Sequence, residues 1–462
     1  MNHRFLSLLL LLFFGSGLRA QTVSPSAILS ERERARVVDE ILEDRFTNLL
    51  PQLMRREGID MWVLISREYN EDPVLKTMLP STWLSARRRT IIVFYDPGVV
   101  TSGVATSGEG KELEKLAIAR YDVGNLLKGA WDIDVRPNQW DALVKIIQDR
   151  KPKKIGLNFS PNYGHADGLT MTEHGELMAR LPAEYQKRIV PAERLAVGWL
   201  ETRTAKEMAI YPLICRLSHQ IIQEGFSEQV IQPGVTTTDD VVWWFRQRIT
   251  ELGLETWFHP TVDIQRADAQ EFEHLRTFSK RSSGQVIMPG DLLHVDFGIT
   301  YLRLNTDQQQ HAYILRPGET EVPEALRKAF QQGNRLQDIL TERFQAGRTG
   351  NQLLLESLEQ AKKEGIVGTI YTHPIGVHGH AAGPTIGLWD QQKGVPGPGD
   401  YPLFANTAYS IELNAAVEVP EWKKTVRIML EEDGFFDGKS FRYIDGRQTE
   451  IFTIPRKLSY VK

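Results

Sequence analysis

The feature that most constrains the fold is a set of acidic side chains inside apolar segments of the second half of the chain. Asp296 stands in Leu292–Gly298, an apolar run typical of a β-strand. A carboxylate buried there is costly unless a positive charge compensates it, although Asp296 could also simply cap a turn before Gly298. Asp307 follows eleven residues later, and a strand, a tight turn and a return strand would place both carboxylates side by side. Because adjacent carboxylates repel, a metal ion shared between them is expected.

A Gly-rich loop and two further strand-like segments add more groups of the same kind. The loop, residues 372–383, holds three of the chain's eleven histidines, namely His373, His378 and His380. Glu412 and the pair Glu431-Glu432 each stand in an otherwise apolar segment, where a single Glu would more often be a surface residue. Two Asp, one His and two Glu suit a pair of Mn, Co, Fe or Zn ions better than a Cys-rich structural zinc site. Two ions about 3.5–4 Å apart can generate a hydroxide and polarise a carbonyl group.

The pattern of secondary structure divides the chain into two parts. In the first part, an amphipathic helix is predicted over residues 30–57, and apolar strands predicted at 60–66, 90–95 and 154–158 alternate with helix-like segments. The alternation predicts an N-terminal α/β domain over residues 28–195. The second part, residues 200–458, is predicted to be α+β. Its expected helices begin at 204, 238, 323 and 350, and its expected strands span 291–300, 310–315, 408–417 and 426–432. Pro212 is expected to kink or restart the helix that begins at 204.

The first twenty residues are typical of a secretory signal peptide. His3 and Arg4 precede an apolar stretch that is too short to span a bilayer, and a small-residue exit ends at Ala20. We therefore predict a signal peptide over residues 1–20, a periplasmic or secreted location, and no membrane attachment after cleavage. The remaining chain has one cysteine, Cys215, so no intramolecular disulfide can form and the core alone must hold the fold. With 55 Lys and Arg against 59 Asp and Glu, the net charge of -4 argues against nucleic acid as a partner.

In order and spacing, these motifs resemble the creatinase/methionine-aminopeptidase superfamily, also called the pita-bread superfamily. The length of the chain is similar to its Xaa-Pro aminopeptidase and prolidase branch. Five anchors carry the resemblance: Asp296-Phe-Gly298, the eleven-residue step to Asp307, His373-Pro-Ile-Gly376 with His380 seven residues beyond, Ile411-Glu412, and Leu430-Glu-Glu-Asp433. The resemblance implies a C-terminal pita-bread catalytic domain preceded by a creatinase-type N-terminal α/β domain, and a homodimer.

The resemblance also implies a role for each anchor residue. Asp296 would chelate one ion, Asp307 and Glu431 would bridge both, and His373 and Glu412 would complete the second. A hydroxide that bridges the ions would attack the scissile carbonyl, Glu412 would move its proton, and His380 would stabilise the tetrahedral intermediate. The substrates would be short peptides with Pro at the second position, and manganese the first choice of metal. An upstream His facing the substrate is assigned to His274, with His259 as the alternative.

This chain departs from the family pattern at several positions. Residues 306–310 are Thr-Asp-Gln-Gln-Gln, where relatives commonly have Ser-Asp-x-Thr-Arg. Residues 427–431 are Arg-Ile-Met-Leu-Glu, where relatives have Arg-Ile-Glu. Glu431 and Glu432 compete for the last ligand position. We favour Glu431, because Glu431-Glu-Asp433 followed by Gly434-Phe-Phe matches the family's Glu-Asp-Asp-apolar run and because an extended strand would point Arg427 and Glu431 to the same face. Pro374 replaces a small residue, and His378 is additional. The ligand set is intact, whereas substrate preference is open, and Trp257-Phe258 could either line a substrate pocket or pack in the core.

Two other functions share the same fold. The chain could be an inactive, metal-free scaffold that binds peptides or a partner, because some superfamily members have lost ligands. It could also be a hydrolase like creatinase, which breaks a C–N bond that is not a peptide bond without using a metal. The complete acidic set favours the dinuclear metallopeptidase, and metal content distinguishes it from both alternatives.

Overall fold

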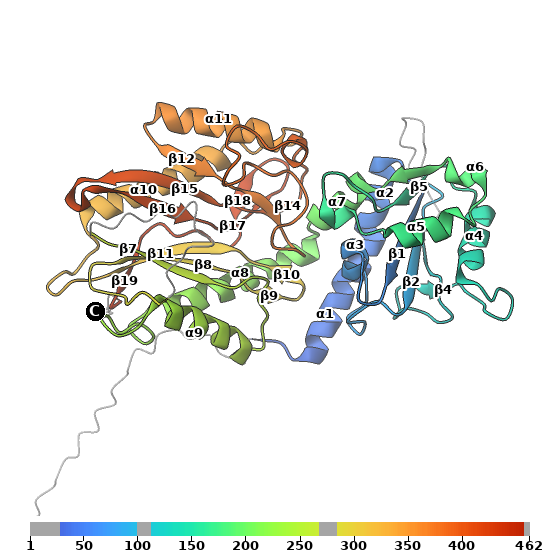
Figure 1. The fold of residues 1–462 in the computed structure, drawn as a ribbon, viewed down its shortest axis with the longest axis horizontal. Coiled ribbons are helices and arrows are strands. Elements are labelled where there is room, and N and C mark those ends of the chain that lie inside the picture. The colour runs from blue at the N-terminus through green and yellow to red at the C-terminus, as the bar shows by residue number, and fades with distance from the viewer. Residues whose placement is uncertain (1–27, 99–111, 268–283, 457–462) are drawn as a thin grey trace, which may run out of the picture.

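The computed structural model describes residues 28–98, 112–267 and 284–456, and shows two parts side by side (Figure 1). The predicted signal peptide and His274 lie outside the described residues. Among the helices of the described ranges, none combines the length and the apolar character needed to cross a membrane.

The N-terminal part is a mixed six-stranded sheet with helices around it, in the order β4-β3-β2-β1-β5-β6. Its strands are β1 (Met61–Arg67), β2 (Arg89–Tyr95), β3 (Glu114–Ala117), β4 (Lys128–Gly129), β5 (Ile155–Leu157) and β6 (Ile189–Pro191). Its helices are α1 (Glu31–Asp44), α2 (Leu50–Glu57), α3 (Pro73–Thr77), α4 (Gln139–Arg150), α5 (Met171–Met178), α6 (Ala183–Gln186) and α7 (Glu193–Glu201), with a π-helical turn at Arg45–Leu49 and a 3₁₀ turn at Gly164–Ala166. The strands predicted at 60–66, 90–95 and 154–158 correspond to β1, β2 and β5, so the predicted α/β fold is confirmed.

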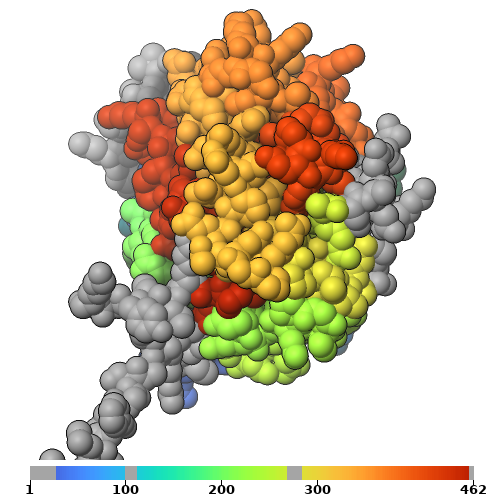
Figure 2. Space-filling view, turned by 90° about the vertical axis from the view of Figure 1, so that its left-hand side faces the viewer, coloured from blue at the N-terminus to red at the C-terminus, as the bar shows by residue number. Residues whose placement is uncertain are grey.

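The C-terminal part has two halves of similar construction, each with helices on the outside of a sheet. One half places α8 (Ala205–Gly225) and α9 (Thr238–Glu251) against β7 (Thr261–Gln265), β8 (Leu292–Phe297), β11 (Gln308–Ile314) and β19 (Phe452–Ile454). The other places α10 (Glu324–Thr341) and α11 (Gly350–Lys363) against β12 (Val367–Ile370), β15 (Leu413–Val419) and β16 (Lys424–Leu430). In Figure 2 the yellow-orange segment that contains α10 runs between red C-terminal segments.

A further sheet and a small hairpin complete this part. The sheet joins β13 (His373–Ile375), β14 (Thr407–Ser410), β17 (Asp433–Phe436) and β18 (Phe441–Tyr443) in chain order. The hairpin pairs β9 (Thr300–Tyr301) with β10 (Leu304–Asn305). Its two turn residues, Leu302 and Arg303, have φ of 53° and 63°, as a type I′ turn requires. The hairpin lies between β8 and β11, which pair antiparallel with Asp296 opposite Gln309.

Pro212 corrects one prediction. The helix does not restart there, since α8 runs unbroken from Ala205 to Gly225 with Pro212 inside it. Its inner face, which includes Tyr211, Ile214 and Leu217, is buried in the core that α8 shares with α9 and the β8–β11 sheet. Tertiary packing therefore outweighs the lost hydrogen bond and the ring clash that a proline causes in an isolated helix.

Candidate metal centre

Breaks between strands position most of the predicted ligands. Asp307 follows β10 and precedes β11, Glu412 lies between β14 and β15, and Glu431 lies between β16 and β17. At Glu412 and at Glu431 the chain crosses from one sheet into another, so both glutamates lie where two sheets meet. Asp296 is near the end of β8, and His373 is the first residue of β13. Side chains from five separate segments therefore converge on one place.

The ligand atoms fall into overlapping groups. In three groups the ligand atoms lie within 4.8 Å of one another. One group is Asp307, His373 and His380, and the two groups that contain Glu431 are Asp296, Asp307, Glu431 and His373, Glu412, Glu431. His373 Nε2 lies 3.7 Å from Asp307 Oδ2 and 3.6 Å from Glu431 Oε1. Glu431 belongs to both groups, which is the arrangement expected of a carboxylate shared by two ions.

Without a bound cation, the buried carboxylates repel one another. Burial raises the pKa of Asp307 well above its ordinary value, and the charges of Glu431 and Asp296 raise it further. Burial and the same neighbouring charge of Glu431 raise the pKa of Glu412 in the same way. Burial also opposes the ionisation of Glu431, but His373 and a hydrogen bond from Ser410 outweigh burial and hold that pKa below its usual range. Such a group stores charge repulsion that a bound cation relieves.

Buried polar atoms with no hydrogen-bond partner support a metal at this place. His373 Nδ1 lies 3.0 Å from the carbonyl oxygen of Pro374, which can only accept, so Nδ1 carries the proton. Nε2 of His373 points at Asp307 and Glu431 and has no hydrogen-bond partner, so it would offer its lone pair to a bound ion. Oδ1 of Asp307 is likewise buried without one. Hard oxygens with one correctly oriented imidazole fit a divalent ion of the Mn, Co, Fe or Zn type.

Hydrogen bonds from neighbouring residues hold these carboxylates in place. Ser410 Oγ donates to Glu431 Oε1 at 2.6 Å and to the Asp307 carbonyl oxygen at 3.3 Å. The backbone N–H of Asp307 points at both oxygens of the Asp433 carboxylate, at 3.3 and 3.4 Å. Gln309 Nε2 donates to Glu412 Oε1 at 2.9 Å and to Glu431 Oε2 at 2.6 Å.

The two candidates for the last ligand position face opposite ways. Glu431 joins the cluster, whereas Glu432 accepts from Gln310 Nε2 at 2.8 Å and from the Gln448 backbone at 3.0 Å. Glu432 also pairs with His219 Nε2 at 2.6 Å. The geometry thus separates two residues that the sequence could not clearly distinguish.

His380 lies at the edge of the cluster and is exposed on one side. Its ring centroid is 4.8 Å from that of His373 and 5.0 Å from that of Trp257. Partial burial and the neighbouring His373 lower the pKa of His380 to about 4, so the ring is neutral near pH 7. Trp257 donates Nε1–H to the Thr306 carbonyl oxygen at 3.0 Å, which fixes the indole beside the cluster.

The alternative for the upstream histidine lies elsewhere. His259 is exposed and contacts Arg246 and the Trp243 ring of α9. In the described part of the chain, it belongs to none of the groups of close ligand atoms. The assignment of this role to His274 stays a prediction, since that residue lies outside the described ranges.

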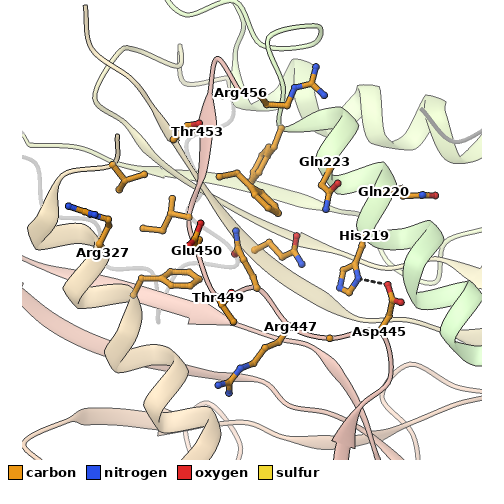
Figure 3. Close-up of a pocket in the computed structure, with 18 of the residues that line it drawn as sticks. His219, Gln220, Gln223, Arg327, Asp445, Arg447, Thr449, Glu450, Thr453 and Arg456 are labelled. Carbon is orange, nitrogen blue, oxygen red and sulfur yellow. Dashed lines mark hydrogen bonds and ion pairs between the residues drawn. The ribbon is translucent and has the colours of Figure 1, made fainter. Parts of the chain in front are cut away.

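Figure 3 shows a cavity of about 1020 Å³ at another place in the described structure. It lies between α8 and α10 beside β19, and none of the five predicted ligands lines it. His219 and Asp445 face each other on its wall, and Gln310 and Gln448 also line it. Because Gln310, Gln448 and His219 contact Glu432, this cavity lies behind the chain segment whose other side carries Glu431.

Sequence reasoning missed three residues that contact the ligands or their partners. Ser410 stands two residues before Glu412, and Gln309 stands two residues after Asp307, where only its departure from the family pattern was visible. His294 precedes Asp296 by two residues, so the alternation of a strand places both on one face. His294 Nε2 lies 2.9 Å from Gln309 Oε1. The sequence signal that could have identified His294 was a histidine in an apolar strand, two residues before Asp296.

Comparison with known proteins agrees with the motifs. Residues 213–432 match the profile of metallopeptidase family M24. The X-Pro aminopeptidase of Thermotoga maritima MSB8 superposes with a TM-score of 0.59 at 17% identity, covering 87% of this chain and 99% of that one. The Xaa-Pro dipeptidase of Bacillus anthracis gives a TM-score of 0.55 at 15% identity, covering 92% and 100%. The prolidase of Pyrococcus horikoshii OT3 gives 0.52 at 13%, covering 90% and 99%.

No protein of curated function matches the chain significantly in sequence. At such low identities the superpositions establish the fold of both parts but not the substrate. They extend over the N-terminal α/β part as well as the helix-flanked sheets that follow it. The predicted resemblance is therefore confirmed: residues 213–432 match metallopeptidase family M24, and the chain, including its N-terminal α/β part, has the fold of the X-Pro aminopeptidase and Xaa-Pro dipeptidase structures.

Proposed function

We propose that the protein is a metal-dependent peptidase that cleaves short peptides at Xaa-Pro bonds, with two divalent ions as cofactors. Asp296, Asp307, His373, Glu412 and Glu431 would hold the ions, and manganese is the first metal to test. The observation that carries the proposal is that Glu431 belongs to two overlapping groups of close ligand atoms, one with Asp296 and Asp307 and one with His373 and Glu412. One carboxylate shared by two such groups is the geometry of a dinuclear site.

The side chains around the cluster have distinct tasks in this proposal. Bound ions would supply a hydroxide near neutral pH and polarise the scissile carbonyl. Glu412 is half-buried whereas Glu431 is buried, so Glu412 is placed to pass a proton to the leaving amine. His380 is exposed beside His373 and neutral, so its N–H is available to stabilise the oxyanion as it develops.

The substrate class rests on different support. The structures that superpose on the chain include an X-Pro aminopeptidase and an Xaa-Pro dipeptidase, each covered almost completely. Their names suggest Pro at the second position, and the M24 match supports peptides as substrates. Whether dipeptides or longer peptides are preferred is a question for experiment.

The deciding experiment combines metal content with cleavage. Metal is measured by mass spectrometry on protein purified without chelators, and Ala-Pro and Ala-Pro-Ala are tested with and without Mn²⁺. About two ions per chain and Mn²⁺-dependent cleavage are expected. Cleavage of the dipeptide alone would identify a dipeptidase, and cleavage of the tripeptide an aminopeptidase. Protein that binds no divalent metal would contradict the proposal and favour a peptide-binding scaffold or a creatinase-like hydrolase.

We also infer export and dimerisation from the sequence and its resemblance. The support for export is the leader-like pattern of residues 1–20, and N-terminal sequencing of the secreted or periplasmic protein should begin at Gln21. A mature protein that begins at Met1 would contradict export. Sedimentation equilibrium should give about twice the chain mass if the protein is a homodimer.

A further inference from the structure

A buried amide lies inside the candidate metal centre. Gln309 is 5% exposed, and its Nε2 donates to Glu412 Oε1 at 2.9 Å and to Glu431 Oε2 at 2.6 Å. The same residue is tied to Glu431 through the backbone, because each N–H donates to the other's carbonyl oxygen, at 3.0 and 3.3 Å. One glutamine thus contacts two carboxylates that come from different strand breaks.

A histidine fixes the orientation of that amide. His294 is 4% exposed, and its Nε2 lies 2.9 Å from Gln309 Oε1. As metal ligands Glu412 and Glu431 are ionised and only accept, so the NH₂ group of Gln309 must face them and its oxygen must face His294. His294 Nε2 must therefore carry a proton and donate it. If the Gln309 amide were flipped, its oxygen would face the two carboxylates and its NH₂ group would face the N–H of His294.

The opposite side of His294 completes the chain of contacts. His294 Nδ1 faces the Asp263 carboxylate at 3.7 Å, and the two residues are opposite each other in the pairing of β7 with β8. Gln309 in turn lies opposite Asp296 in the pairing of β8 with β11. Three adjacent strands thus support one amide from behind, so its position depends on the sheet and not on a flexible loop.

We propose that Gln309, oriented by His294, is a positioning residue that holds Glu412 and Glu431 in the geometry that binds the ion next to His373. The inference rests on the proposed function, because it concerns the metal site of that peptidase. Each carboxylate oxygen has two lone-pair directions, so an oxygen that accepts from Gln309 can still bind an ion. Without the amide, the two carboxylates would lose the donor that they share and would repel each other into other rotamers.

The chain offers matched controls for both residues. Gln310 is the next residue of β11 and is 3% exposed, but its Nε2 donates to Glu432 on the opposite face. His311 is buried on the same strand and its ring centroid lies 5.2 Å from that of His294, but its Nε2 accepts from the Met429 backbone, so it does not share the hydrogen bond to Gln309. Gln310→Ala and His311→Asn therefore remove a buried side chain of the same kind without removing the contacts of Gln309 with His294, Glu412 and Glu431.

The test measures Mn²⁺ affinity directly, on the full chain stripped of metal and titrated by equilibrium dialysis. Gln309→Ala should weaken one of the two ions about 10- to 100-fold and change the other much less. His294→Leu should weaken the same ion, and His294→Gln, which keeps a donor toward Gln309 Oε1, should restore most of the affinity. The double variant Gln309→Ala/His294→Leu should be no weaker than Gln309→Ala alone, because His294 acts through Gln309. Gln310→Ala and His311→Asn should bind both ions within about threefold of the parent protein.

Other outcomes would overturn the inference. If Gln309→Ala binds Mn²⁺ as Gln310→Ala does, while the parent protein binds two ions and cleaves Ala-Pro peptides, only the positioning role is wrong. If the parent protein binds no divalent ion, the proposed function and this inference both fail. Urea unfolding of the metal-free proteins identifies any variant that does not fold. If Gln309→Ala or His294→Leu does not fold, the test uses His294→Gln. Failure of His294→Gln to bind Mn²⁺ as the parent protein does would contradict the orienting role.

Discussion

Glu431 and Glu432 illustrate how far a motif can assign a single side chain. The spacing of the family pattern placed a ligand at one of these two positions, and the preference for Glu431 relied on an extended strand that continues to that residue. The structure ends β16 at Leu430, so strand alternation is not what directs Glu431 to the cluster. The backbone bridge between Glu431 and Gln309 does so, and it joins residues far apart in sequence. Such a contact is invisible before the fold is known.

Neutralising each of these two glutamates should have opposite consequences. Glu431→Gln removes a shared carboxylate, so Mn²⁺ binding and peptide cleavage should fall at least about 100-fold while the metal-free protein stays folded. Glu432→Gln leaves the cluster intact but deprives the half-buried imidazole of His219 of its closest carboxylate, so the free energy of unfolding should fall by about 1–3 kcal/mol with little loss of metal. Metal titration and urea unfolding of both variants check this. The reverse pattern would assign the ligand role to Glu432.

His219 gives the protein a specific dependence of stability on pH. Burial disfavours its charged form, but the carboxylates of Glu432 and Asp445 outweigh burial and raise its pKa to about 10. A histidine whose pKa is raised on folding stabilises the folded state below its unfolded pKa of about 6.5, and this stabilisation disappears as the pH rises toward 10. The free energy of unfolding should therefore decrease between pH 6.5 and 10, by roughly 5 kcal/mol at most from this group.

The measurement is urea unfolding at several pH values in the parent protein and in His219→Gln. The variant keeps a hydrogen-bond donor near Glu432 but does not titrate, so the decrease above pH 6.5 should be much smaller. His259, which is exposed, provides a control, since His259→Gln should leave the pH profile unchanged. An equal decrease in both histidine variants and in the parent protein would show that other groups cause it.

Among helices and strands, the sequence predicted the type of the main elements better than their boundaries and connections. The strand predicted at 408–417 is two strands, β14 and β15, which separate at Ile411-Glu412 and belong to different sheets. The segment is apolar on both sides of the break, so periodicity gave no sign of it. The sheet change is set by pairing with β13 and β12, which only the tertiary structure provides. The chemistry of the site was therefore predictable, but the crossing that positions Glu412 was not.

Replacing Pro212 tests whether packing alone maintains α8. A proline inside a helix costs about 3 kcal/mol through a missing N–H bond and a ring clash, whereas its restriction of the unfolded chain returns about 0.5–1 kcal/mol. Pro212→Ala should therefore raise the free energy of unfolding by about 1–2 kcal/mol. Leu213→Ala, at an exposed neighbouring position, should change it by less than about 0.5 kcal/mol. Destabilisation by Pro212→Ala would mean that the proline ring is itself part of the packing.

The two parts of the chain are joined by a buried group of charges. Glu207, near the start of α8, accepts from Arg45 at 2.8 Å and from Arg203 at 2.7 Å, and all three side chains are at most 4% exposed. Arg45 comes from the N-terminal part and also donates to the carbonyl oxygens of Thr202 and Trp199. Burial lowers the pKa of Arg45 to about 10, which leaves it charged near pH 7. Two guanidinium groups thus depend on one carboxylate at the junction.

Removing that carboxylate should loosen the junction. Glu207→Gln leaves two buried cations without a counter-charge, so the free energy of unfolding should fall by about 3–5 kcal/mol. Cleavage of the connection at residues 202–204 by trypsin should become faster, because Arg203 is held by Glu207 and by the Leu200 carbonyl oxygen. Glu224→Gln is the matched control, since Glu224 pairs with Arg248 between α8 and α9 inside one part of the chain. It should lower stability without exposing the connection to trypsin. If Glu207→Gln alters neither stability nor cleavage, the interface between the two parts depends on apolar packing around Phe46, Trp199 and Leu200 instead.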